Sequence, residues 1–273
     1  LYRNGGQFYN LTQDEEVPTG YFASSWYPSS NEGDLYKIAV WFEFQDDNSN
    51  FGSTSATLES FKTTGGAYKL ARYRWNWQTR GYGGTASNYT NVFNLVAAAN
   101  DNTSNYVPGL LNLADIDEWM HVFAYHRILG NWDSYSFSVG QNMYAYKLPE
   151  STWKLMPWDI DFTLGDGNGA TDPLWGGQDP IVNRMYDNPT FRRMLWRAYQ
   201  EALAGPLLPE RYNPVIDARR SYLLKNAVTG LSTPTPVKSY LTQRRNYLIS
   251  QLKANDATAL TITTSGGFNF NSP

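Results

Sequence analysis

The sequence predicts an α+β fold with a small β portion and a larger helical part. Strands are indicated by short apolar or alternating runs between turn residues, of which 140–148 and 153–157 are the clearest. Helices are indicated by apolar stripes at helical spacing in the later part of the chain. The 273 residues are enough for one large domain or for two closely joined lobes.

The first part of the chain is predicted to hold strands and loops. Residues 1–18 indicate a hairpin, because a turn sequence is followed by weak alternation. Residues 19–37 are rich in Ser, Gly, Pro and Asn, which indicates a loop that ends in a turn and a strand. Residues 68–77 alternate large and charged side chains and predict a half-exposed strand.

The later part is predicted to be helical. The predicted helices cover 88–99, 112–130, 188–205, 209–224 and 234–254. Gly130 is expected to end the second of them as a C-cap glycine. In the fourth, the expected inward side chains are Val215, Ile216, Tyr222 and Leu223. The dibasic pairs, Arg244-Arg245 among them, are expected on solvated helix faces.

Composition limits the possible functions. The net charge is −3, so the sequence predicts no nucleic-acid partner. Aromatic residues make up 16% and charged residues 17%, which suits a rigid extracytoplasmic protein or a carbohydrate binder. There is no cysteine, and no apolar run approaches the roughly 20 residues that span a bilayer. His121 and His126 are five positions apart, which does not match a helical metal-binding pair.

The most informative stretch is 153–165, in which a predicted buried strand leads to two aspartates. On a strand, Asp159 and Asp161 would point to the same face, roughly 6.5–7 Å apart. A cation between them would relieve their mutual repulsion, and Mg²⁺ is usually held by one or two carboxylates plus substrate phosphates. The alternative is an Asx turn at the end of the strand with one salt-bridged aspartate. The spacing alone leaves both interpretations open.

The same stretch resembles a known family. Residues 157–161, Pro-Trp-Asp-Ile-Asp, followed by Gly165, are similar to the PWDxD…G signature of the CotH (spore-coat protein H) kinase family. The segments 33–37, 131–133 and 141–146 follow the order and approximate spacing of such proteins, and the resemblance covers roughly residues 8–253. Members are atypical, secreted or surface-associated protein kinases with a diverged kinase fold.

The resemblance implies a role for each of several residues. Asp133 would orient the acceptor hydroxyl, and Asp159 would bind Mg²⁺ with help from Asp161 and Asn142. These four side chains are expected to converge on one cleft. There is no His-Arg-Asp or Asp-Phe-Gly motif, so these assignments rest on the family resemblance.

The resemblance also suggests how ATP would be held. Trp153 matches the place of a tryptophan that stacks on adenine, with one ring face expected to be open. Lys37 could bind phosphate. The alternatives are that Trp153 is a core residue and that Lys37 is a solvated strand lysine.

The resemblance predicts a kinase-like domain over 1–254, mainly a helical C-terminal lobe, and a linker or the start of a β module over 255–273. Family members carry an earlier β-rich segment with a phosphate-covering loop and an ATP-contacting lysine. No Gly-x-Gly-x-x-Gly is present here, so the N-terminal lobe is expected to be incomplete and to need a further segment or another chain.

The predicted function is Mg-dependent transfer of the ATP γ-phosphate to Ser or Thr of an extracytoplasmic protein, such as a surface or coat protein. One alternative is a catalytically silent relative that acts as a structural or adhesive surface module. A glycan-active protein is a further alternative. It fits less well, because Asp159 and Asp161 are neighbours on one strand, whereas glycosidase carboxylates flank the scissile bond.

Overall fold

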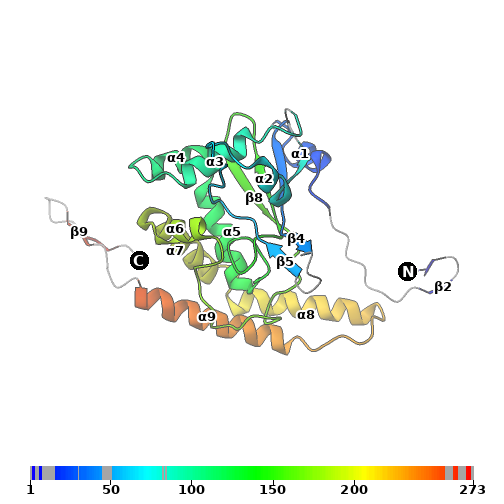
Figure 1. Cartoon of the computed structure of the whole chain (residues 1–273). Helices are drawn as coiled ribbons and strands as arrows, with labels where there is room; N and C mark the ends of the chain where they lie inside the picture. Colours follow the sequence, from blue (N-terminus) through cyan, green and yellow to red (C-terminus); the bar gives the residue numbers. More distant parts are fainter. Residues whose placement is uncertain are drawn as a thin grey trace.

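The computed structural model has a small antiparallel sheet and a larger set of helices, which confirms the α+β class (Figure 1). The structure describes residues 16–29, 31–44, 51–81, 83 and 85–255, with strand residues 2–3, 6–7, 261–263 and 269–271. The sheet has the strand order β6-β3-β7-β8. Its strands are β3 (Asp34–Ile38), β6 (Trp77–Gly81), β7 (Met143–Lys147) and β8 (Trp153–Pro157).

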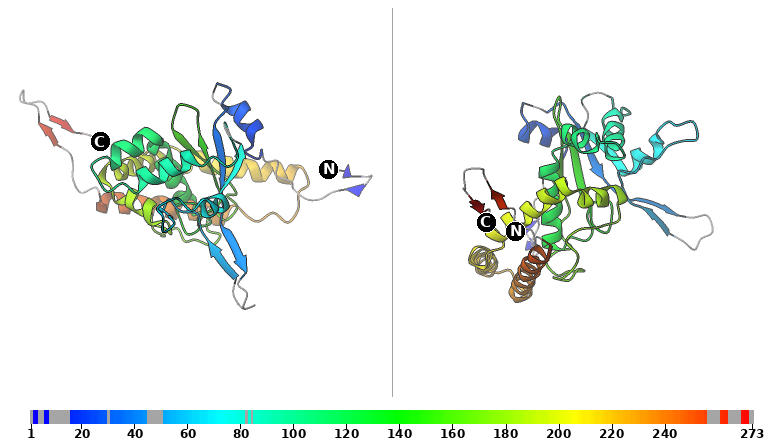
Figure 2. Two further views of the ribbon diagram at one scale, coloured as in Figure 1. Left: turned by 45° about the horizontal axis from the view of Figure 1, so that its top comes forward. Right: turned by 90° about the vertical axis from the view of Figure 1, so that its left-hand side faces the viewer.

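Three further strand pairs lie outside this sheet. They are β1 (Tyr2–Arg3) with β2 (Gly6–Gln7), β4 (Trp41–Phe44) with β5 (Phe51–Thr54), and β9 (Thr261–Thr263) with β10 (Asn269–Asn271). The β4–β5 pair projects from the body of the molecule (Figure 2). The β1–β2 pair agrees with the predicted N-terminal hairpin, whose remaining residues up to 15 lie outside the described part of the chain.

Helices form most of the remaining structure. They are α1 (Gly20–Trp26), α2 (Leu70–Asn76), α3 (Thr90–Ala99), α4 (Tyr106–Leu113), α5 (Ile116–Leu129), α6 (Pro180–Asp187), α7 (Pro189–Ala204), α8 (Pro209–Lys225) and α9 (Thr235–Asn255). The predicted caps are confirmed at α5, where Gly130 adopts a left-handed φ of 71°, and at α7, where Asn188 accepts from the Thr190 N–H. Within the described ranges, every helix is too short or too polar to cross a bilayer.

The two faces of the sheet bury different side chains. Tyr36, Ala145 and Leu155 are cross-strand neighbours on the inner face and belong to the main core. On the outer face, Tyr144 belongs to a smaller cluster that also contains Ala23 of α1. One face therefore packs on the helical part, while the other has a thinner cover.

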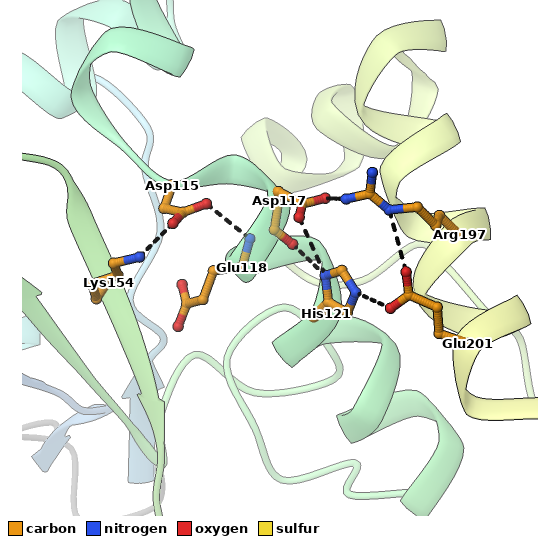
Figure 3. Close-up of polar contacts among 7 residues, drawn as sticks. All are labelled: Asp115, Asp117, Glu118, His121, Lys154, Arg197 and Glu201. Carbon is orange, nitrogen blue, oxygen red and sulfur yellow. Dashed lines mark hydrogen bonds and ion pairs between the residues drawn. The ribbon is translucent and has the colours of Figure 1, made fainter. Parts of the chain in front are cut away.

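Helix α5 links the sheet to α7 through its first turns (Figure 3). On the sheet side, the Leu155 N–H on the free edge of β8 donates to both Glu118 carboxylate oxygens at 3.3 Å. On the opposite side, His121 Nε2 lies 2.8 Å from Glu201 of α7, and its Nδ1 lies 2.7 Å from the Asp117 carbonyl. Arg197 of α7 also pairs with Asp117.

Glu118 and His121, at the two ends of this connection, each have a higher pKa in the folded protein than in the unfolded chain. Burial raises the pKa of Glu118 to about 7. Partial burial lowers the pKa of His121, but the hydrogen bonds to the Asp117 carbonyl and to Glu201, with the charges of both carboxylates, raise it overall above its usual value. Because both ring nitrogens of His121 face acceptors, the protonated imidazolium satisfies both contacts.

We expect Glu118 and His121 each to contribute stability that is lost as pH rises between about 5 and 8. His126 contributes in the opposite direction up to about pH 6.5, because its pKa is lowered on folding. From pH 4.5 to about 7, folded Glu118 retains a proton that the unfolded chain releases, so folding becomes less favourable. The His121 contribution is complete below about pH 6.5 and is lost as pH rises through its raised folded pKa. Urea unfolding at pH 5 and 8 would test both contributions.

The variants Glu118→Gln and His121→Gln are each expected to show a smaller difference between the two pH values. For His121 the reduction is about 0.5 kcal/mol, because its partners are partly exposed and solvent screens them. This account would be contradicted if, in both variants, the free energy of unfolding differed between pH 5 and pH 8 by as much as it does in the unmodified protein.

The prediction of a strand over 68–77 is wrong for most of its length. Residues 70–76 form α2, whose buried residues are Tyr73 and Asn76, three positions apart on one helical face. The Tyr73 hydroxyl donates to the Glu59 carbonyl at 2.7 Å and accepts from the Phe61 N–H at 3.0 Å. The Asn76 amide donates to the Ala39 and Thr54 carbonyls, both at 2.8 Å. These tertiary bonds favour the helix over the local alternation.

Other expectations also need correction. Residues 20–26, predicted as loop, form α1, whose first turn is capped by Thr19. In α8, Val215 and Tyr222 are 60% and 67% exposed, so two of its four predicted inward residues are not buried. Arg244 of α9 is 0% exposed, in contrast to the expected solvated face.

Candidate active site

The loop after α5 presents Asp133 on a fixed backbone. Gly130 ends the helix, and the Asn131 N–H donates to the His126 carbonyl at 2.9 Å. The fully buried Asn131 side chain lies 3.0 Å from His126 Nδ1. Burial lowers the pKa of His126 to about 4, so this histidine is neutral and acts as a buried structural residue.

Asn142 and Asp133 are in direct contact, as the predicted convergence requires. The Asn142 amide donates to Asp133 Oδ2 at 3.0 Å and to the Asp133 carbonyl at 2.8 Å. The Gln141 amide also donates to the Asp133 carboxylate. Because the amide nitrogen of Asn142 is committed to Asp133, its Oδ1 is the atom that remains for another partner.

Asp159 enters the site through a turn and not from a strand. Strand β8 ends at Pro157, and the Trp158 N–H donates to the Asn142 carbonyl at 3.2 Å. Asp159 then adopts a left-handed φ of 51°, and Asn142 has a φ of 53°. The predicted same-face geometry on a strand is therefore wrong for Asp159 and Asp161. Two left-handed non-glycine residues at one place are typical of a site whose backbone is held by its surroundings.

The negative charges of Asp159 and Asp161 act on Asp133. Partial burial, followed by the like charges of Asp159 and Asp161, raises the pKa of Asp133, while hydrogen bonds from Gln141 and Asn142 oppose the rise. Within the described residues, none of the three carboxylates forms an ion pair. No protein cation offsets the negative charge beside Asp133. A position that binds a cation shows this pattern when only the protein groups are present.

The donors suit a hard cation, but the protein does not enclose one. All available ligand atoms are oxygens, from carboxylates and an amide, which is the preference of Mg²⁺. In the described part of the chain, no three acidic or histidine side chains are grouped closely enough to hold a metal by themselves. Asp161 also uses Oδ1 to accept from the Phe162 N–H at 3.0 Å. A metal here would therefore need ligands from a substrate.

The loop that follows Asp161 is anchored on the helical part. The Leu164 N–H donates to the Leu129 carbonyl of α5 at 2.7 Å. Gly167 has a φ of 92° and lies against Trp132, where an added Cβ would approach Trp132 Nε1 to 2.4 Å. The Trp132 and Phe162 rings are in contact, with centroids 5.6 Å apart. These contacts hold the loop with Asp159 and Asp161 beside the loop with Asp133.

The prediction that Trp153 offers an open ring face to adenine is wrong. Its side chain is 0% exposed, and its ring lies 5.7 Å from Tyr36 and 6.3 Å from Trp77. The alternation of β8 directs Trp153 and Leu155 into the main core. The alternative interpretation, a core tryptophan, is the one that the structure supports.

Lys37 lies on the outer face of the sheet. It pairs with Tyr144 of β7, which in turn pairs with Met156 of β8, so the three form one row across the strands. Trp158 packs on the same face, with its ring 5.5 Å from that of Tyr144. Arg80 also interacts with Tyr144. The phosphate-binding role of Lys37 stays a prediction.

Two residues of this region, Trp158 and Gln141, have no role predicted from the sequence. Trp158 belongs to the Pro-Trp-Asp-Ile-Asp motif, and its position one residue before Asp159 is the signal that could have found it. Gln141 precedes Asn142, but its bond to Asp133 has no sequence signature, because it depends on how two loops meet.

Comparison with known proteins agrees with the motif. The family model described as CotH kinase protein matches residues 15–247, which is most of the chain. No curated protein gave a significant match. Because the family model covers far more than half of the chain, this protein belongs to the CotH kinase protein family.

Proposed function

We propose that this protein is a secreted or surface-associated protein kinase that transfers the γ-phosphate of ATP to Ser or Thr of an extracytoplasmic protein, with Mg²⁺. The observation that carries the proposal is that Asp133 lies near enough to Asp159 and Asp161 for their like charges to raise its pKa, while none of the three forms an ion pair with a described lysine or arginine. Family membership supports a kinase-like protein and association with a spore coat or surface. We further propose that the α+β architecture is a diverged kinase fold.

In this proposal Asp133 orients the acceptor hydroxyl and takes its proton. Its carboxylate is positioned by the amides of Gln141 and Asn142. Asp159, Asp161 and Asn142 Oδ1 would hold Mg²⁺, which when bound would neutralise charge on the transferring phosphoryl group. The raised pKa of Asp133 increases its affinity for the proton that it accepts.

The outer face of the sheet is the proposed nucleotide surface. It joins the carboxylates through Trp158, which directly precedes Asp159. The half-buried Met156 and Trp158 provide apolar area there, and Lys37 and Arg80 provide positive charge. We propose this face in place of Trp153, because a fully buried ring has no surface for a base.

A catalytically silent structural module is the second candidate. It is favoured by the lack of a preformed group of three ligand side chains in the described residues. The two functions differ in nucleotide binding, because a silent module that has lost the site has no reason to bind Mg-ATP.

Calorimetric titration with Mg-ATP tests the proposal. We expect binding that needs Mg²⁺ and that is weakened at least about tenfold by Asp159→Asn, because a carboxylate ligand is replaced by a neutral amide. Asp166→Asn is the matched control, since Asp166 is an exposed carboxyl on the same loop.

Transfer is then measured with γ-labelled ATP and a set of secreted and surface proteins as acceptors, and the products are mapped by mass spectrometry. Absence of Mg-ATP binding together with absence of labelled Ser or Thr would favour the silent module.

A further inference from the structure

An apolar groove of about 470 Å³ lies between α5, α8 and the first turns of α9. It is lined almost entirely by apolar side chains, including Tyr125 and Leu129 of α5, Leu164, Val215 of α8 and Leu241 of α9. The one charged residue in its lining is Arg211. This groove lies outside the carboxylate site described above.

The groove adjoins the candidate active site along the chain. Leu129 is four residues before Asp133, and Leu164 is three residues after Asp161. The Leu164 N–H donates to the Leu129 carbonyl at 2.7 Å, so the two segments meet in the wall of the groove. Three residues span at most about 11 Å, which places the Leu164 backbone within reach of the carboxylates.

Exposed apolar side chains also lie beside the carboxylates in the chain. Ile160 and Phe162, which alternate with Asp159 and Asp161, are 49% and 40% exposed. Phe162 rests on Trp132, the neighbour of Asp133. A polypeptide chain with apolar side chains could therefore make apolar contacts both in the groove and beside the carboxylates.

The groove walls are incompletely covered in the single chain. Tyr125 is 41% and Val215 is 60% exposed, and α8 buries only Tyr212 among its described side chains. Arg211 is exposed and forms no ion pair within the described residues. Exposed apolar surface of this kind marks interaction sites, and an unpaired arginine at its rim selects a partner that carries a carboxylate.

We propose that this groove docks the segment of the substrate polypeptide that flanks its acceptor hydroxyl. The segment carries aliphatic or aromatic side chains that fill the groove and an acidic residue that pairs with Arg211. This inference rests on the proposed kinase function. A substrate must place its acceptor hydroxyl at Asp133, so the residues that flank the hydroxyl must lie nearby. The groove adjoins the carboxylates and is therefore in the right place to bind those residues.

Binding of three labelled 16-residue peptides tests the inference by fluorescence anisotropy. Each peptide contains one serine. Two carry a block of three leucines and one glutamate, on the N-terminal or the C-terminal side of the serine, and the third has glutamine in place of each leucine. We expect one leucine peptide to bind about tenfold or more tightly than the glutamine peptide, since burial of the leucines exceeds the loss of peptide freedom.

Variants on α8 assign the binding to the groove. Val215→Asp places a charge in the groove at an exposed position, so folding is retained, and it is expected to weaken leucine-peptide binding about tenfold. Arg211→Glu is expected to weaken leucine-peptide binding as well, because the new carboxylate would repel the glutamate of the peptide. Tyr222→Asp is the matched control: Tyr222 is an exposed apolar residue of the same helix and does not line the groove.

Several results would overturn the inference. Equal binding of the leucine and glutamine peptides would do so, as would tight binding that Val215→Asp leaves unchanged. Sedimentation velocity that shows a dimer for the unmodified protein and a monomer for Val215→Asp would assign the groove to a second copy instead. Peptide binding that depends on Val215, without phosphate transfer to the serine, would retain the docking site and reject the proposed kinase function alone.

Discussion

Asp133→Asn is expected to lower the rate of phosphate transfer by about 10²- to 10⁴-fold, which is the range for removal of a general base. Asparagine keeps the size of the side chain and its oxygen can still accept from the Asn142 amide, while its NH2 can donate to Gln141 if the Gln141 amide is turned over, but it cannot take the hydroxyl proton. Asp133 orients the acceptor and does not hold the metal in this proposal. Mg-ATP affinity is therefore expected to stay within about threefold, or to rise slightly as repulsion from Asp159 and Asp161 is removed.

This split between rate and affinity separates a catalytic role from a structural one. Single-turnover transfer and calorimetric Mg-ATP binding are measured on the same protein, with Asp166→Asn as a control that is expected to change neither. Thermal unfolding of Asp133→Asn shows whether the loop contacts with Gln141 and Asn142 persist. Full activity in Asp133→Asn would remove this residue from the mechanism even if ATP binds.

Local sequence signals predicted the helix ends well, because caps depend on a few neighbouring residues. Gly130 ends α5 in the left-handed conformation that glycine adopts readily, and Asn188 caps α7 before a proline. The order of Asp133, Asn142 and Asp159 came from the family motif. The hydrogen bond that joins Asn142 to Asp133 required the structure, because two turns bring these residues together.

The errors arose where distant contacts decide the outcome. The alternation around 70–76 suited a strand, yet Tyr73 and Asn76 find hydrogen-bond partners in other segments only when this stretch is helical. Strand β8 forms where a buried strand was expected, but its side chains alternate between buried and partly exposed, and the sequence does not say which face α5 covers. Trp153 is on the covered face, and this excludes the adenine role that the motif suggested.

Arg244 is the clearest case of a residue whose local sequence conceals its role. Its dibasic neighbourhood resembles that of the other arginine pairs, but its side chain is 0% exposed. The guanidinium donates to the Arg127 carbonyl in the last turn of α5 at 2.7 and 3.1 Å. It also donates to the carbonyls of Ala170 and Asp172, at 3.0 and 2.6 Å. It therefore joins α9 to the end of α5 and to residues 170–172.

Arg244→Met is expected to lower the free energy of unfolding by about 3–5 kcal/mol, because each carbonyl left without a donor costs about 1–3 kcal/mol. Methionine fills part of the space, but the carbonyls of Ala170 and Asp172 lose their donor, and the negative end of the α5 dipole loses a cation. For a chain of this size each kcal/mol corresponds to about 2–4 °C in Tm. Urea and thermal unfolding measure the loss, with Arg193→Met as a control at an exposed α7 position, where a change within about 0.5 kcal/mol is expected. A loss as small as that of the control would mean that the bonds of Arg244 contribute little to stability and that α9 is held by its apolar stripe alone.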